Sequence, residues 1–163
     1  MKLYFMRHGE AESLQFQGGP DADSQRALTA QGRLDVAAVV ESRKESLSDI
    51  EVILCSPYLR AQQSAQIAAQ HLGFRDKALI CNELIPDSNF VTLERTLKKL
   101  IDETDPAAIL LASHQPLLGK VLSTLTGNAR LELISPAWLV AVETDIFAPG
   151  FGEFCWLQKP DKG

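Results

Sequence analysis

Basic side chains follow three apolar segments of the sequence, close to the point where each segment ends. Arg7 and His8 come directly after residues 2–6, KLYFM. Arg60 lies shortly beyond the run EVILC, and His114 follows the run AAILLAS directly. Guanidinium groups bind phosphate oxygens through paired donors, and imidazole nitrogens can donate or accept. If the four side chains converge, they form a small cationic pocket suited to a dianionic phosphate or phosphoryl group.

The strands and helices that must position these side chains can be predicted from the spacing of hydrophobic residues. Short apolar runs alternate with segments of helical spacing, which is typical of an α/β protein with a largely parallel sheet. The predicted strands cover residues 2–6, 51–55, 77–81, 107–113, 137–144 and 152–159. The predicted helices cover residues 30–47, 58–73, 91–103 and 116–125. Thr29 is the expected N-cap of the first helix, and residues 14–27 are expected to form a loop.

The arrangement of these elements predicts a three-layer α/β/α sandwich. A short turn at Pro149 and Gly150 joins the last two strands, so the largely parallel sheet should have an antiparallel strand near the C-terminus. The chain has no repeat, no low-complexity segment and no linker long enough to divide it. We therefore expect one domain over residues 1–163.

Convergence of the basic side chains follows from this sheet. The carboxyl ends of parallel strands share one edge, where ligands bind in open α/β sheets. Gly9 permits the backbone to turn after Arg7 and His8. Ser56 and Pro57 are expected to begin a helix, which places Arg60 about one turn inside it. Helical side chains lean toward the N-terminus, so Arg60 can reach back over the strand ends.

Composition sets bounds on the partners and the compartment. The net charge is −5 and no block of Lys or Arg stands out, which argues against nucleic acid or a membrane as the main partner. We see no signal peptide and no apolar stretch of roughly 18 residues, so a cytoplasmic protein is expected. Cys55, Cys81 and Cys155 are far apart and are expected to be buried small hydrophobes rather than disulfide or metal ligands.

Four motifs resemble those of a known family. They are RHGE at 7–10, LTAQG at 28–32, SPYLRAQQSA at 56–65 and SHQPLLG at 113–119. In this order they resemble the histidine phosphatase superfamily, also called the phosphoglycerate mutase-like fold. The compact length and the SHQPLLG segment are most similar to its SixA-type phosphohistidine phosphatases. The resemblance implies that His8 is the nucleophile, that Arg7 and Arg60 bind phosphoryl oxygens, and that His114 is the second histidine of the phosphate pocket.

Family mutases carry Ser and Asn where this chain has Ala11 and Leu14, which disfavours a mutase.

Two further residues are candidates for the site. The family's general acid is often a Glu after the third strand, and the segment CNELIPDS offers Glu83. The alternative for Glu83 is a loop carboxylate that pairs with a basic neighbour. Arg26, on the loop before LTAQG, is expected to line the rim and contact the substrate.

The chemistry expected from this site is phosphoryl transfer to nitrogen. Neutral His8 attacks phosphorus, a phosphohistidine intermediate forms, and water then hydrolyses it. Fixed cations hold the phosphoryl oxygens, so no metal or other cofactor is expected.

Three functions remain open at this point. The first is a phosphatase for phosphohistidine on a signalling protein. The second is a phosphatase for small phosphoesters or sugar phosphates. The third, from another class, is a catalytically silent phosphate-binding docking module, which would have no need of a nucleophile.

Overall fold

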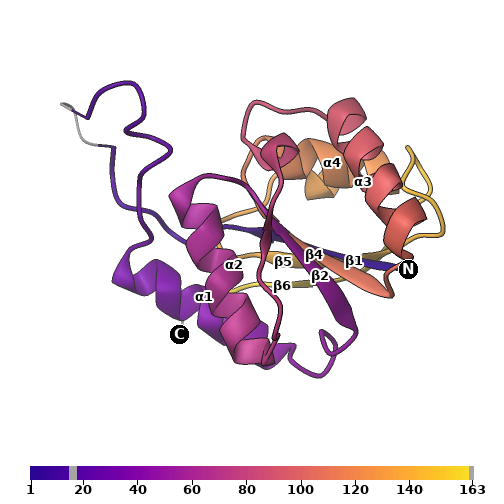
Figure 1. The fold of residues 1–163 in the computed structure, drawn as a ribbon, viewed down its shortest axis with the longest axis horizontal. Coiled ribbons are helices and arrows are strands. Elements are labelled where there is room, and N and C mark those ends of the chain that lie inside the picture. The colour runs from indigo at the N-terminus through magenta and orange to yellow at the C-terminus, as the bar shows by residue number, and fades with distance from the viewer. Residues whose placement is uncertain (15–17, 162–163) are drawn as a thin grey trace.

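The protein is described here by a computed structural model that covers residues 1–14 and 18–161. Residues 15–17, within the predicted loop, and residues 162–163, at the end of the predicted domain, lie outside the described residues. A six-stranded sheet lies at the centre, with α1 and α2 on one face and α3 and α4 on the other (Figure 1). The strands are β1 Lys2–Arg7, β2 Ile50–Cys55, β3 Leu79–Ile80, β4 Ala108–Ser113, β5 Leu139–Glu143 and β6 Glu153–Gln158. The helices are α1 Ala30–Ser42, α2 Leu59–Leu72, α3 Phe90–Thr104 and α4 Leu117–Thr126, with short 3₁₀ turns η1 Asn82–Leu84 and η2 Ala129–Glu132.

The strand order in the sheet is β3-β2-β4-β1-β5-β6. The first four strands of the chain are parallel, and β4 lies between β1 and β2. β5 runs antiparallel to β1, and β6 runs antiparallel to β5. The predicted fold class, a largely parallel α/β sandwich with antiparallel pairing near the C-terminus, is confirmed.

Each face of the sheet has its own hydrophobic core because neighbouring strand residues point to opposite sides. On β1, Leu3 and Phe5 pack toward α3 and α4, whereas Tyr4 and Met6 pack toward α1 and α2. All four side chains are nearly inaccessible to solvent. The strand that carries Arg7 and His8 at its end is therefore held rigidly from both sides.

The first helix begins as predicted and ends earlier than predicted. The Thr29 side chain accepts a hydrogen bond from the Gly32 N–H at 2.9 Å and so caps the N-terminus of α1. The helix ends at Ser42, not at residue 47. The chain turns after it because Leu47 enters the core and the Tyr4 hydroxyl donates to the Ser46 carbonyl at 2.7 Å.

The start of the second helix differs from the prediction. Ser56 is not an N-cap, since α2 begins at Leu59 after Tyr58. The Ser56 hydroxyl oxygen instead accepts the Tyr58 N–H at 3.2 Å. Arg60 is thus the second residue of α2 and lies very close to the strand ends. The predicted end at Gly73 is confirmed, with that glycine in the left-handed conformation at φ 64°.

Two remaining features concern the cysteines and the membrane. Cys55 and Cys81 are buried, as predicted, but Cys155 is exposed on the edge strand β6, so that prediction was wrong. Among residues 1–14 and 18–161, no helix is both long and apolar enough to cross a membrane.

Candidate active site

The ends of β1, β4 and β2 lie side by side and bring three sequence motifs together. Backbone pairing with β4 continues one residue beyond the ends of β1 and β2. The His8 N–H donates to the Ser113 carbonyl at 3.0 Å, and the Ser56 N–H donates to the Ala112 carbonyl at 3.1 Å. His114 follows β4 and lies between them. The ring centroids of His8 and His114 are 5.0 Å apart. The predicted convergence at the strand ends is therefore what the fold produces.

Two hydrogen bonds determine the proton position on His8. Its Nδ1 lies 2.7 Å from the Gly9 carbonyl oxygen, which can only accept, so Nδ1 carries the proton. Its Nε2 lies 3.2 Å from the Arg60 Nε–H, which can only donate, so Nε2 offers a lone pair. Burial lowers the pKa of His8 to about 4, with added repulsion from Arg60 and Arg7, although the Gly9 contact opposes this shift. A neutral imidazole with an unprotonated Nε2 is the form that can act as a nucleophile.

Arg60 joins this histidine to the loop before α1. Its Nη1 donates to the Asp23 carbonyl at 2.7 Å, and its Nη2 lies 3.4 Å from the Asp23 Oδ2. The guanidinium carbon also lies 5.0 Å from the centroid of the Tyr58 ring. Only 4% of Arg60 is exposed, and desolvation lowers the pKa of its guanidinium. Arg60 is thus a buried cation aimed at His8.

His114 is held on one side and unpaired on the other. Its Nε2 lies 2.8 Å from the Ser56 Oγ, and the Tyr58 ring packs against it at 5.0 Å between centroids. Its Nδ1 is buried and has no hydrogen-bond partner within the part of the chain that the structure describes. Burial lowers the pKa of His114 to about 2, helped by its neighbours His8 and Arg60.

Arg7 lies at the edge of the same site. Its Nη1 donates to the Ile134 carbonyl at 2.8 Å, and its buried Nε has no partner among the described residues. The Arg7 charge acts on the pKa of both histidines. A cavity of about 710 Å³ opens beside Arg7, between the start of α4 and the segment 132–135, with Leu133 80% exposed. The cavity therefore adjoins the site at Arg7.

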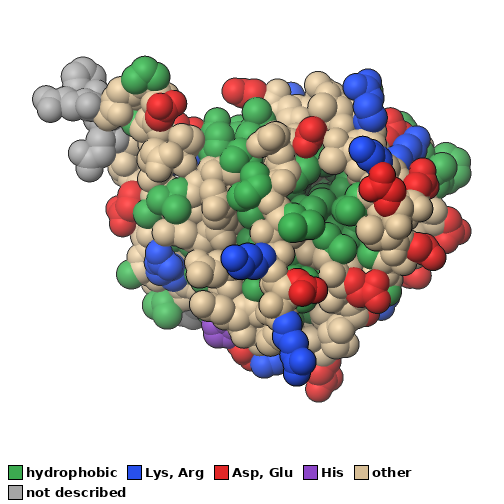
Figure 2. All heavy atoms as spheres, in the orientation of Figure 1, with side chains coloured by type: hydrophobic (Ala, Val, Ile, Leu, Met, Phe, Trp, Pro, Cys, Tyr) green, Lys and Arg blue, Asp and Glu red, His purple; other side chains and the backbone are tan. Residues whose placement is uncertain are grey.

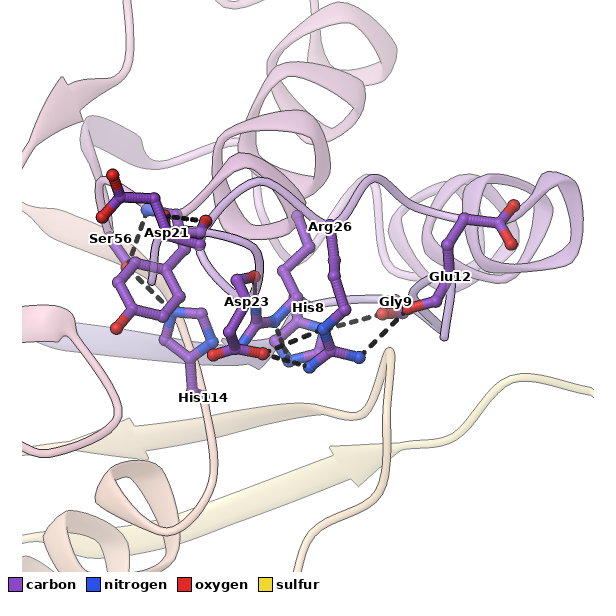
Figure 3. A network of polar contacts seen from close by, with 11 residues as sticks. His8, Gly9, Glu12, Asp21, Asp23, Arg26, Ser56 and His114 are labelled. Atoms are coloured by element: carbon purple, nitrogen blue, oxygen red, sulfur yellow. Dashed lines mark hydrogen bonds and ion pairs between the residues drawn. The ribbon is translucent and has the colours of Figure 1, made fainter. Parts of the chain in front are cut away.

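Arg26 lies at the mouth of the site and is paired there with a carboxylate. Its Nε donates to the Asp23 Oδ1 at 2.9 Å, its Nη2 forms an ion pair with the same oxygen at 2.8 Å, and its Nη1 donates to the Glu12 carbonyl at 3.1 Å (Figure 3). The Arg26 side chain is 26% exposed, which agrees with the predicted position at the rim. Sequence reasoning missed Asp23, because it lies in a loop whose sequence carries no periodic signal.

Glu83 lies on η1, which packs on the end of β4. The Ser113 hydroxyl donates to the Leu84 carbonyl at 2.6 Å and fixes this turn near His114. The half-buried Glu83 carboxylate accepts from the Cys81 thiol at 3.4 Å. Among the described residues no hydrogen bond links Glu83 to His8 or His114, and no ion pair links it to a basic neighbour.

The RHGE segment and α1 are in very close contact. A Cβ atom on Gly32 would lie 2.2 Å from the Glu10 carbonyl oxygen, and one on Gly9 would lie 2.6 Å from the Gly32 carbonyl oxygen. The Gly9 N–H donates to the Ser64 Oγ at 3.1 Å, and the Ser64 hydroxyl donates to the Arg60 carbonyl. The LTAQG motif thus supports the strand end that presents His8.

No group of three or more His, Cys, Asp or Glu side chains suited to a metal ion occurs in residues 1–14 and 18–161. The polar groups that do converge are two arginines and two neutral histidines. This donor set fits an anion with several oxygens, such as a phosphoryl group.

Comparison with known proteins agrees with this geometry. The family model described as histidine phosphatase superfamily (branch 1) matches residues 3–107. The phosphohistidine phosphatase SixA of Escherichia coli strain K12 is 28% identical over 160 residues, which cover 98% of this chain and 94% of that protein. The structure of the protein histidine phosphatase SixA complexed with tungstate superposes with a TM-score of 0.84 at 28% identity, over 98% of this chain and 97% of that one. The alpha-ribazole phosphatase of Shigella flexneri, at a TM-score of 0.71 and 19% identity over 98% and 96% of the two chains, shares the fold.

Proposed function

Since this chain belongs to the histidine phosphatase superfamily and is a phosphatase, we propose that it hydrolyses phosphohistidine on a signalling protein. The observation that carries the proposal is the proton position on His8. Its Nδ1–H is held by the Gly9 carbonyl, and its Nε2 lone pair faces the buried Arg60 guanidinium. This arrangement prepares one nitrogen for attack on an anionic phosphoryl group.

In the first step the His8 Nε2 attacks phosphorus in line with the leaving group. The new P–N bond to His8 forms as the bond from phosphorus to the substrate nitrogen breaks. The bonding pair leaves with the substrate ring, whose other nitrogen carries a proton taken up from solvent, so neutral imidazole departs. The Arg60 Nε–H, which lies 3.2 Å from the lone pair that attacks, turns to a phosphoryl oxygen. The Gly9 carbonyl stabilises the positive charge that develops on the His8 ring.

Three side chains hold the remaining phosphoryl oxygens. Arg7 and Arg60 supply charge, and His114 supplies its unpaired Nδ1. The Ser56 oxygen accepts a hydrogen bond from the Tyr58 N–H, and the Ser56 hydroxyl can itself donate a hydrogen bond to the His114 Nε2. In that arrangement the proton of the neutral His114 ring lies on Nδ1. A neutral donor at this position adds a hydrogen bond to a phosphoryl oxygen.

In the second step water attacks the phosphorus on the face opposite His8. The P–N bond breaks, the electron pair returns to the His8 Nε2, and inorganic phosphate leaves with the oxygen of water. The fixed cations supply the charge stabilisation, so the mechanism requires no metal ion.

Phosphohistidine is the favoured substrate class because of its leaving group. Imidazole has a conjugate-acid pKa of about 6.5, so it leaves without strong help from a general acid. Glu83, the candidate acid, bonds to the Cys81 thiol and to neither histidine. The open cavity beside Arg7 adjoins the site, and we expect a protein-borne phosphoryl group to approach from this side. The partner is then a phosphorylated cytoplasmic protein.

A small-molecule phosphoester phosphatase is the second candidate. It is favoured by the shared fold with an alpha-ribazole phosphatase and by the size of the cavity beside Arg7, which can hold a small substrate. A panel of phosphohistidine proteins and common phosphate esters, compared by kcat/KM, distinguishes the two.

The test of the proposal is a search for the covalent intermediate. His8→Ala should abolish turnover while circular dichroism shows a folded protein. Rapid quench of the wild type with ³²P-labelled phosphohistidine substrate should trap label on His8 that is labile in acid and stable in base. His71→Ala is the matched control, because His71 contacts Glu41 and lies outside the site, and it should retain activity. Label on a serine or aspartate would refute the assignment of His8.

A further inference from the structure

The carboxylate of Asp23 occupies the donors of two arginines at the mouth of the phosphate pocket. Its Oδ1 accepts a hydrogen bond from the Arg26 Nε at 2.9 Å and forms an ion pair with the Arg26 Nη2 at 2.8 Å. Its Oδ2 lies 3.4 Å from the Arg60 Nη2. Figure 3 shows this carboxylate facing the Arg26 guanidinium next to His8. A negative charge of the protein therefore lies where the substrate brings another.

Every nitrogen of the Arg60 side chain contacts another group of the protein. Nε faces the His8 Nε2, Nη1 donates to the Asp23 carbonyl at 2.7 Å, and Nη2 faces the Asp23 carboxylate at 3.4 Å. A phosphoryl group needs some of the same donors. The carboxylate contact is the longest of the three and is the one that an incoming anion can replace at the lowest cost.

We propose that Asp23 is a positioning residue whose carboxylate competes with phosphate for Arg60 and Arg26, and so promotes release of the phosphate product. This inference rests on the proposed phosphate site and adds a residue that neither the motifs nor the proposed mechanism uses. Without a competing charge, a pocket with three guanidinium groups would retain inorganic phosphate and suffer product inhibition.

The charge and the exposure of Asp23 fit this role. Partial desolvation raises the pKa of its carboxyl, but the hydrogen bond from Arg26 and the charge of Arg60 outweigh this and hold the pKa below its usual range. The group is therefore ionised at neutral pH. Its side chain is 46% exposed, so the carboxylate can swing into solvent when phosphate enters.

Removing this charge leaves both arginines anchored. Arg60 keeps its 2.7 Å bond to the Asp23 backbone carbonyl, which a side-chain substitution does not remove. Arg26 keeps its 3.1 Å bond to the Glu12 carbonyl. The variant Asp23→Asn, similar in shape, thus tests the charge of the carboxylate rather than the placement of the arginines.

The experiment measures inorganic phosphate binding by titration calorimetry and the inhibition of turnover by phosphate. Asp23→Asn should bind phosphate about tenfold more tightly than the wild type, the effect of one unit charge close to a dianion in a partly solvated site. The KM for the substrate should fall together with the dissociation constant of phosphate. If Asp23 had a merely structural role, its replacement would raise both the KM and the dissociation constant. Asp23→Ala should change phosphate affinity in the same direction, which covers the case in which Asp23→Asn does not fold.

Two matched controls separate this effect from general electrostatics. Asp21→Asn removes the same charge from the same loop, where the Asp21 contact in Figure 3 is made by its backbone carbonyl, and should leave phosphate affinity within about twofold. Asp23→Glu keeps the charge and should bind phosphate with an affinity close to that of the wild type.

The outcomes also separate this inference from the proposed function. If the wild type hydrolyses phosphohistidine but Asp23→Asn and Asp23→Ala bind phosphate no more tightly, the competition by Asp23 is refuted and the function stands. The same holds if Asp21→Asn tightens phosphate binding equally. If the variants bind phosphate more tightly but no substrate is hydrolysed, the role of Asp23 stands and the proposed function fails. If the wild type neither binds phosphate nor turns over, both fail.

Discussion

His8 and His114 are histidines whose surroundings oppose protonation. They are 7% and 1% exposed, and two arginines lie close to them. Burial is the main cause that lowers their pKa values to about 4 and about 2. Both rings are therefore neutral at the pH at which an exposed histidine begins to take up protons. The site thus keeps His8, the proposed nucleophile, in its neutral form at the expense of stability in acid.

This feature predicts an acid-sensitive fold. The folded-state pKa values lie below the value of about 6.5 for an unfolded histidine, so between these values the unfolded chain binds more protons. The free energy of unfolding should therefore fall as pH drops, by about 1–2 kcal/mol per histidine between pH 7 and pH 5. Urea unfolding at the two pH values measures the loss. His114→Gln should lose less than the wild type, and equal losses in both proteins would contradict this account.

The four central site residues could be predicted from sequence, for a topological reason. Arg7, His8 and His114 follow strands, Arg60 follows a strand through a short turn, and parallel strand ends share an edge. Asp23 could not be predicted in the same way, because a carboxylate in a loop has no periodicity that indicates its direction. The chemical roles of these residues remain predictions.

At the scale of elements, the position of α1 determines where the turn after β1 can lie. The helix approaches the RHGE segment so closely that glycine is the residue that fits on both sides of the contact. Thr29 reinforces the contact, since its N–H donates to the Glu10 carbonyl at 3.0 Å. The start of one helix thus supports the turn that follows His8.

Gly32→Ala tests this support. The new Cβ would lie 2.2 Å from the Glu10 carbonyl oxygen, so the loop after His8 must move. We expect a loss of about 1–3 kcal/mol in the free energy of unfolding, as is typical of overpacking, together with a lower kcat. Chemical denaturation and steady-state kinetics measure the two effects. Leu34→Ala, at a position 65% exposed on the same helix, should change neither quantity appreciably. An active and fully stable Gly32→Ala would show that the contact relaxes freely.

Element boundaries were less predictable than element types. Residues 43–47 continue a helical pattern and contain good helix formers, yet α1 stops at Ser42 because Leu47 is required in the core. The predicted strand 77–81 is reduced to Leu79–Ile80, since β3 pairs with β2 over only two residues. The spacing of hydrophobic residues within a segment does not indicate such requirements of tertiary packing and strand pairing.

At the scale of the whole molecule, the distribution of charge can be followed on one face. Figure 2 shows both kinds over the same face, with apolar side chains gathered around a hollow between them. The net charge of −5 is thus not concentrated in one area of that face. This distribution fits the prediction against nucleic acid as the main partner, which stays a prediction.

The choice of substrate by the whole protein should depend on the leaving group. We expect the wild type to prefer a phosphohistidine protein to a sugar phosphate by kcat/KM. Glu83→Gln should slow alkyl phosphate hydrolysis much more than phosphohistidine hydrolysis, because an alkoxide needs a proton in order to leave. Measuring both substrates with both proteins provides the check. A wild type that prefers the sugar phosphate, with both substrates slowed alike in Glu83→Gln, would support the small-molecule phosphatase instead.

The central position of β4 in the sheet has a consequence for folding during translation. A ribosome releases β1 and β2 long before β4, yet β4 is the strand that pairs with both of them. Until residues 108–113 emerge, the two earlier strands keep unpaired edges, which are the parts of a nascent chain most exposed to wrong association. His8 is translated well before His114, which emerges directly after the strand that joins β1 and β2. The two histidines can therefore come together only when β4, the strand between β1 and β2, has been synthesised.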